Sequence, residues 1–158
     1  MDHPVTRART KPEVGSGTRV LFLAIAVLSL AGMIVSAISL QRHYAKSATS
    51  YCEFGEKFNC DIVNRSEYSS LLGIPVAGIG VAGYGLLLLL STRKRSDNRT
   101  PTRLLFAASA GLAFALYLTY VEAYVLTTWC ILCLTSLAMI SLIAVLAGIL
   151  KVSQPKDL

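Results

Sequence analysis

The reactive chemistry of this 158-residue chain lies in four cysteines, two of which form the motif Cys130-Ile-Leu-Cys133. Cysteines three residues apart at the start of a helix share one face and lie about one turn apart. The free N–H groups and the positive dipole end of such a helix favour a thiolate. The motif therefore predicts a reactive thiol pair rather than two small apolar side chains of a helix.

The second pair is Cys52 and Cys60, with seven residues between them. One reading is a structural disulfide that closes a loop, which typically stabilises a fold by a few kcal/mol. The other is exchange with the Cys-x-x-Cys motif, since two neighbouring pairs can pass electrons by thiol–disulfide exchange. A soluble dithiol would then reduce the Cys52–Cys60 disulfide, and Cys60 would attack Cys130. Cys133 would be released as a thiolate and would need a lipid-soluble acceptor, for which a quinone is suited.

Zinc is the rival use of four cysteines. The seven-residue gap lies outside the two to four residues that usually separate zinc-binding cysteines. We also expect Cys133 to face the bilayer, away from the other sulfurs. The sequence therefore predicts no metal site.

The apolar content shows which elements must position the cysteines. The chain is 54% hydrophobic, its mean hydropathy is +0.58, and a hydrocarbon core is spanned by roughly 20 apolar residues. A membrane-spanning segment that is not part of a barrel must be helical, because lipid cannot satisfy an open backbone. We predict an all-α, integral membrane four-helix bundle with an exoplasmic loop between the first two helices. The transmembrane domain covers residues 20–150 and is flanked by a flexible cytoplasmic tail at 1–19 and a second tail at 151–158. Its spans are expected at residues 20–40, 71–91, 104–126 and 130–150.

The basic residues predict the orientation. Eleven of the fifteen Lys and Arg residues precede the first span, lie between the second and third, or follow the fourth. The positive-inside rule then places both termini in the cytoplasm and all four cysteines at the exoplasmic, oxidising face. In this setting the net charge of +6 reflects topology, and no nucleic-acid partner is predicted.

Several features near the cysteines carry separate expectations. Cys130 should lie at the water boundary and Cys133 about 4.5 Å deeper, facing lipid. Glu122 should be a solvated carboxylate near that boundary rather than a proton relay. Residues 66–72 are expected to form a short half-helix on the membrane surface.

Residues 20–40 are read as a retained span rather than a signal peptide, whose apolar region is only 7–15 residues long. The glycines of residues 78–85 indicate tight helix packing, or room for a flat ring.

The pattern Cys52-x7-Cys60, Ser66 six residues later, and Cys130-x-x-Cys133 opening the last helix resembles vitamin K epoxide reductases and their bacterial homologues. The resemblance covers roughly residues 20–150 and implies a stand-alone member without a fused thioredoxin domain. It implies four catalytic cysteines: Cys52 meets the redox partner, Cys60 shuttles to Cys130, and Cys133 attacks the quinone.

The same resemblance implies that Ser66 helps to cap the quinone pocket and that Tyr84 belongs to the quinone-binding residues. It also implies a ubiquinone- or menaquinone-type acceptor and a DsbA-like or thioredoxin-like protein as the thiol partner. The expected location is a bacterial inner membrane.

Two departures separate the chain from animal members: Leu137 stands where they carry a tyrosine, and Val76 aligns with their pocket asparagine. Quinone reduction coupled to disulfide formation is therefore the leading function, and vitamin K quinone or epoxide reduction is the alternative. A DsbB-type oxidase would carry its Cys-x-x-Cys after the first span. A four-helix transporter coupled through Glu122 would leave the cysteines unexplained.

Overall fold

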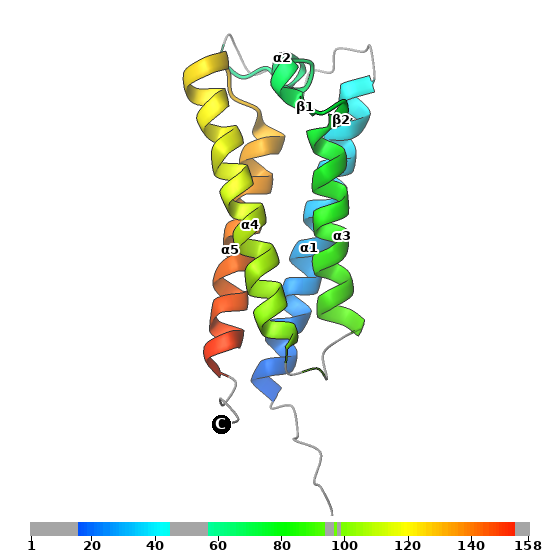
Figure 1. The fold of residues 1–158 in the computed structure, drawn as a ribbon, viewed down its shortest axis with the longest axis vertical. Coiled ribbons are helices and arrows are strands. Elements are labelled where there is room, and N and C mark those ends of the chain that lie inside the picture. The colour runs from blue at the N-terminus through cyan, green and yellow to red at the C-terminus, as the bar shows by residue number, and fades with distance from the viewer. Residues whose placement is uncertain (1–15, 45–56, 94–96, 98, 154–158) are drawn as a thin grey trace, which may run out of the picture.

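The computed structural model describes residues 16–44, 57–93, 97 and 99–153, and four long helices dominate them (Figure 1). Each helix is long and apolar enough to cross a membrane, the third when its last turn is included. This confirms the predicted all-α membrane bundle. The helices are α1 (Ser16–Tyr44), α3 (Val76–Arg93), α4 (Thr100–Val121) and α5 (Ile131–Ser153).

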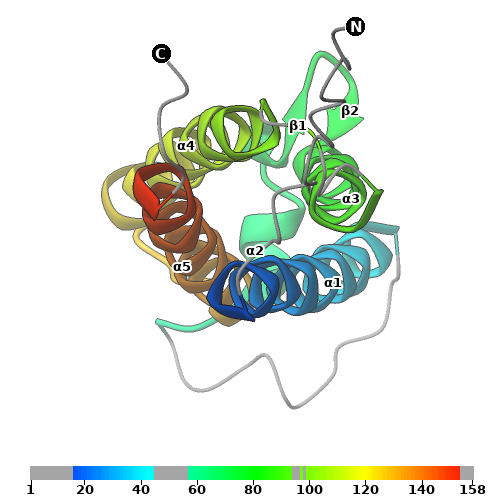
Figure 2. The same cartoon turned by 90° about the horizontal axis from the view of Figure 1, so that it is seen from below.

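The four helices form a ring in the order α1, α3, α4, α5 when the bundle is viewed along its axis (Figure 2). Helix α1 packs extensively on α3 and α5, and α4 packs on α5, whereas the contact between α3 and α4 is the least extensive of the four. The start of α1 and the end of α5 lie at one end of the bundle. A short helix, α2 (Cys60–Asn64), closes the opposite end.

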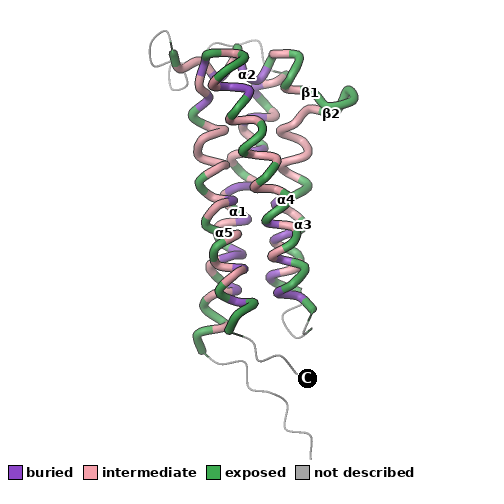
Figure 3. The backbone as a smooth tube through the Cα atoms, turned by 60° about the vertical axis from the view of Figure 1, so that its left-hand side comes forward, coloured by how far each residue is buried: buried purple, intermediate pink, exposed green. Residues whose placement is uncertain are grey.

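Small residues let α1 approach α3 closely. A Cβ atom added at Gly32 would lie 2.4 Å from Cε1 of Tyr84, so only glycine leaves room for that ring. Exposed residues run along the whole length of the long helices, as expected for outer faces that meet lipid (Figure 3). The buried core of the bundle is therefore narrow, and its largest fully buried side chains include Phe22, Leu104 and Ile143.

The segment before α3 differs from the expected half-helix at residues 66–72. It contains only a single 3-10 turn, η1 (Glu67–Ser69), followed by a two-stranded hairpin of β1 (Ser70–Leu71) and β2 (Ile74–Pro75). Leu72 and Gly73 form its turn with φ values of 53° and 83°. This hairpin delays the helix to Val76, five residues after the expected start of the second span.

The connection between α4 and α5 is short. Helix α4 continues into a π-helical turn, η2 (Glu122–Leu126), and Thr127 then ends it in the left-handed conformation with φ 49°. Helices α4 and α5 are therefore antiparallel neighbours.

Candidate redox site

Helix α2 begins at Cys60 because Asn59 caps it. The Asn59 side chain accepts hydrogen bonds from the backbone N–H groups of Asp61 and Ile62, at 3.0 and 3.2 Å. Asparagine is among the preferred N-cap residues because it satisfies donors that have no partner within the helix. An ion pair between Arg42 and Asp61, with 3.8 Å between Nη1 and Oδ1, holds α2 to the end of α1. The Cys60 thiol is thereby fixed at the inner surface of the cap, with no exposed area.

A backbone pairing brings the two cysteine-bearing segments together. Phe58 and Trp129 form a parallel β-bridge, in which Asn59 N–H donates to Trp129 O at 3.2 Å. Trp129 N–H in turn donates to Lys57 O at 2.9 Å. Cys60 lies two residues after Phe58, and Cys130 directly follows Trp129, so the bridge places both cysteines in one buried cluster. The main chain therefore sets the register between the loop cysteine and the Cys-x-x-Cys motif.

Cys130 lies between the other two described sulfurs. It is fully buried, whereas the sequence suggested a thiol at the water boundary. Its hydrogen bond with Cys133 and its burial raise the pKa of the Cys130 thiol, while a hydrogen bond with Cys60 lowers it. The net effect is a pKa above the ordinary value of a thiol. Cys130 and Cys133 are both free thiols in this structure.

Cys133 lines a cavity of about 430 Å³ whose walls come from the four long helices and the cap. The expectation that it faces the bilayer is therefore wrong. Within a helix that is apolar on all sides, spacing shows that Cys130 and Cys133 share a face but does not show which way that face points. In the structure the shared face points to the bundle axis, because Cys130 packs under Cys60.

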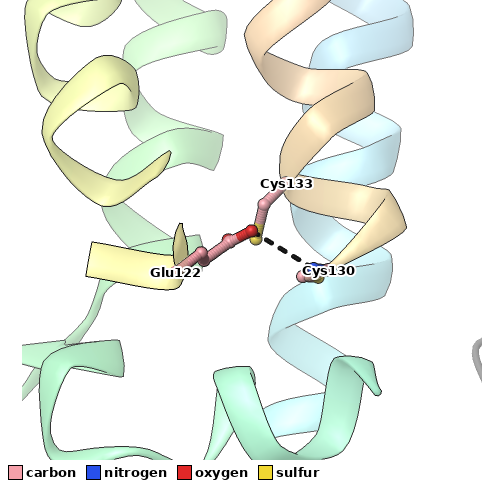
Figure 4. A group of neighbouring side chains, drawn as sticks. All are labelled: Glu122, Cys130 and Cys133. Atoms are coloured by element: carbon pink, nitrogen blue, oxygen red, sulfur yellow. Dashed lines mark hydrogen bonds between the residues drawn. The ribbon is translucent and has the colours of Figure 1, made fainter. Parts of the chain in front are cut away.

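Glu122 is the residue whose environment differs most from expectation. Only 2% of its surface is exposed, so the prediction of a solvated carboxylate is wrong. Its Oε2 accepts a hydrogen bond from the Cys130 backbone N–H at 3.2 Å, and its other oxygen, Oε1, makes no hydrogen bond to the described residues. A carboxylate oxygen of Glu122 and the sulfurs of Cys130 and Cys133 lie within 4.8 Å of one another (Figure 4). A carboxyl group is thus held beside both thiols of the motif.

The cavity is apolar in its middle and polar at the cap. Its volume falls within the 300–1,000 Å³ usual for small-molecule sites, and such sites combine apolar walls with a few fixed polar groups. Asn64 of α2 supplies one such group. Its Oδ1 accepts from Ser39 Oγ at 2.8 Å, whereas its Nδ2 is buried and has no hydrogen-bond partner among the described residues. His43 lies beside it, with 2.6 Å between Nδ1 and the Asn64 carbonyl oxygen.

Ser66 and Tyr84 both line this cavity. The Ser66 hydroxyl donates to Val63 O at 2.8 Å and thereby closes the C-terminal end of α2. The Tyr84 hydroxyl donates to Ser136 O at 2.8 Å and so joins α3 to α5 beside the cavity. Gly80 and Gly83 also line the cavity. Gly80 lies tightly against Ser36, whereas nothing lies within 4 Å of a Cβ at Gly83, so the glycines provide both close packing and open space.

The structure thus brings together Cys60, Cys130 and Cys133, with Ser66 and Tyr84 around the adjoining cavity. Cys52 lies outside the described residues. Sequence reasoning missed the buried role of Glu122 and the cavity-lining amide of Asn64. It also missed the start of α2, although an asparagine directly before Cys60-Asp61 is a recognisable N-cap signal.

Comparison with known families gives a match along most of the chain. The model of the vitamin K epoxide reductase family matches residues 23–147, which include all four cysteines, helices α3 and α4, most of α1 and α5, and the residues that line the cavity.

Proposed function

The chain belongs to the vitamin K epoxide reductase family, a family of membrane oxidoreductases that use quinones and a thiol redox partner, and from this premise we propose a specific electron route. In the proposed function the protein oxidises the dithiol of an exoplasmic, DsbA-like or thioredoxin-like partner. The electrons then pass through Cys52 and Cys60 to Cys130 and Cys133, and finally to a membrane quinone.

The observation that supports this function is the line of three sulfurs that ends at an apolar cavity. Cys60 and Cys130 are in hydrogen-bond contact under the cap, and Cys133 is in contact with Cys130 and lines the cavity. Each sulfur therefore has a neighbour with which it can exchange. The last of them is the one that reaches a space large and apolar enough for a quinone ring.

The proposed steps balance in electrons and protons. The partner's dithiol is oxidised to a disulfide while the Cys52–Cys60 disulfide is reduced to two thiols. Cys60 then attacks Cys130 of a Cys130–Cys133 disulfide, the bond between those two sulfurs breaks, and Cys133 leaves as a thiolate. Cys52 attacks Cys60 in the mixed disulfide, which restores the loop disulfide and leaves Cys130 and Cys133 reduced. Re-formation of the Cys130–Cys133 disulfide would then release two electrons and two protons, which a quinone held in the cavity would take up to become a quinol.

Three further residues have proposed roles around the quinone. The Asn64 Nδ2 group is a hydrogen-bond donor without a partner in the described residues, which suits it to a quinone carbonyl oxygen. Ser66 holds the cap of the cavity, and Tyr84 forms part of its wall. The Glu122 carboxylate is close enough to the Cys133 sulfur to accept its proton before that sulfur reacts.

The proposed orientation has both termini in the cytoplasm and the cysteines at the exoplasmic face. Two features support it. Arg19, Arg93, Arg103 and Lys151 all belong to the bundle end opposite Cys60, as the positive-inside rule requires of a cytoplasmic end. An exoplasmic compartment is also the oxidising one in which a disulfide-forming enzyme works. A bacterial inner membrane fits both features.

The decisive experiment uses the purified full chain in detergent with a reduced thioredoxin-like protein and a soluble ubiquinone or menaquinone analogue. We expect loss of quinone absorbance to match, mole for mole, the disulfides formed in the partner. Growth of a bacterial strain that lacks its own thiol oxidase should be restored by the same chain. Oxidation of the partner without quinone consumption, or no oxidation at all by a folded protein, would contradict the proposed function.

A further inference from the structure

A second chemical property of the site follows from the position of Glu122. Its carboxylate and the sulfurs of Cys130 and Cys133 lie within 4.8 Å of one another, although they come from η2, the connection and α5. Thiolates and carboxylates are the ligands of zinc, and about 2.3 Å from zinc to each sulfur separates two tetrahedral sulfurs by about 3.8 Å. We propose that the reduced site binds a zinc-type divalent cation through Glu122, Cys130 and Cys133.

The unpartnered oxygen of Glu122 is the observation that points to a cation. Glu122 is 2% exposed, and Oε1 has no hydrogen bond to the described residues, while Oε2 is occupied by the Cys130 N–H. A buried carboxylate oxygen without a hydrogen bond is costly, because the oxygen has lost its water. A cation held between the Glu122 carboxylate and the two sulfurs removes that cost.

Cys60 lies beside the proposed site. It is fully buried, packs against Cys130 and is in hydrogen-bond contact with its sulfur. Two sulfurs and one carboxylate oxygen supply three ligands of a tetrahedral set, and water or an added thiol supplies the fourth. The seven-residue gap between Cys52 and Cys60 then raises no objection, since neither is a ligand.

This cation site exists only in the reduced protein. Each thiol loses its proton when it binds the metal, no electrons are transferred, and a Cys130–Cys133 disulfide has no thiolate to offer. A bound cation therefore holds the sulfurs in the reduced state and removes Cys133 from the reaction with an acceptor. The consequence is a redox enzyme that zinc inhibits reversibly, and only after it has been reduced.

The test is a cadmium titration of the full chain in detergent, reduced and then freed of reductant under anaerobic conditions. Cadmium substitutes for zinc, and its thiolate complexes absorb in the ultraviolet. We expect one cadmium ion per chain in the reduced protein, none in the oxidised protein, and loss of the absorption band in Cys133→Ser. Glu122→Gln should weaken binding by about tenfold or more, because even changes to residues that only support the ligands of a metal site cost about that much.

Controls separate this site from simple dithiol chelation. Glu67→Gln changes an exposed carboxylate near the cap and should bind like the unchanged chain. Cys52→Ser should also retain binding, and Glu122→Asp should retain more of it than Glu122→Gln. Equal affinity of the oxidised and reduced proteins, or equal affinity of Glu122→Gln and the unchanged chain, would overturn the proposal. Quinone reduction is measured on the same metal-free samples, so a failure here is distinct from a failure of the proposed enzyme activity.

Discussion

The backbone N–H of Cys130 donates to Oε2 of Glu122 across 3.2 Å, although a π-helical turn and the connection to α5 lie between the two residues. This bond spans eight positions of the sequence and ties the end of α4 to the first residue of the redox motif. It also holds the carboxylate beside the sulfurs of Cys130 and Cys133.

Replacing Glu122 should separate these two effects. Glu122→Gln keeps an oxygen that can accept from Cys130 N–H, whereas Glu122→Ala leaves a buried donor unsatisfied and should destabilise the fold by about 1–3 kcal/mol relative to Gln. Thermal unfolding in detergent, followed by size-exclusion chromatography, measures this difference. Both variants should slow oxidation of the Cys130–Cys133 dithiol by quinone, because the proton acceptor is lost. Equal stability of the Ala and Gln variants would contradict the structural role.

The order of the sulfurs predicts different losses for different cysteines. Cys130→Ala and Cys133→Ala should abolish quinone reduction with any thiol donor, and Cys60→Ala should block transfer from a protein partner. Because Cys130 is fully buried, a small dithiol should also react slowly with Cys60→Ala. Adding Asn59→Ala weakens the start of α2 and should raise that slow rate several-fold. The proposed route is wrong if Cys133→Ala reduces quinone at the normal rate.

The position of Cys133 at the cavity predicts a spectroscopic signal. Cys130→Ser removes the disulfide partner and leaves the Cys133 sulfur beside a bound quinone as a thiolate. We expect a new visible absorption band from thiolate-to-quinone charge transfer when quinone is added to this variant. The additional change Cys133→Ser should remove the band, whereas Cys52→Ser should not. A band that persists without Cys133 would assign the acceptor site to another residue.

Asn64→Leu should weaken quinone binding without preventing chemistry. The change removes the buried Nδ2 donor, and a hydrogen bond of about 0.5–1.5 kcal/mol corresponds to a rise of roughly two- to tenfold in KM for quinone. The kcat at saturating quinone should change much less. Ile62→Ala, on the exposed side of the same short helix, serves as the control and should leave KM unaltered. A normal KM in Asn64→Leu would exclude the amide from quinone recognition.

Gly32→Ala should destabilise the bundle, because its Cβ would lie 2.4 Å from the Tyr84 ring. Overpacking of this kind costs about 1–3 kcal/mol, and displacement of the ring also breaks its bond to Ser136. Gly17→Ala, where a Cβ meets nothing within 4 Å, is the matched control. Unfolding of Gly32→Ala, Tyr84→Ala and the double variant forms a cycle, in which the double variant should be less destabilised than the sum of the two. Strict additivity would mean that the two residues do not interact.

Hydropathy predicted the four helices because lipid imposes one solution on a long apolar segment. The direction in which a helix face points was harder to predict. Cys133 was expected to face lipid and Glu122 to face water, and both face the interior. A membrane helix that is apolar on all sides offers no polar face from which to infer its rotation. The π-helical turn at Glu122–Leu126 further shifts the angular position of its own residues relative to a regular α-helix.

The local structure at the cap depends on single capping and turn residues rather than on hydropathy. The half-helix was expected at residues 66–72, but the helical turn lies at Cys60–Asn64, where Asn59 provides a cap. Polar residues after Ser66 did not distinguish a helix from a hairpin, and Gly73 in the left-handed region decided for the hairpin. The contact between Cys60 and Cys130 depends on a backbone pairing, and no side-chain pattern in the sequence predicts that pairing.

The parallel bridge between Phe58 and Trp129 has a consequence for how this chain can change over evolutionary time. Surface loops ordinarily accept insertions and deletions more readily than helices do. Here Cys60 lies two residues after Phe58, and Cys130 directly follows Trp129. An inserted or deleted residue at either place would therefore displace one sulfur relative to the other. Substitutions of the Phe58 or Trp129 side chains leave that count intact. Length polymorphism at these two places should therefore be far rarer than amino-acid replacement.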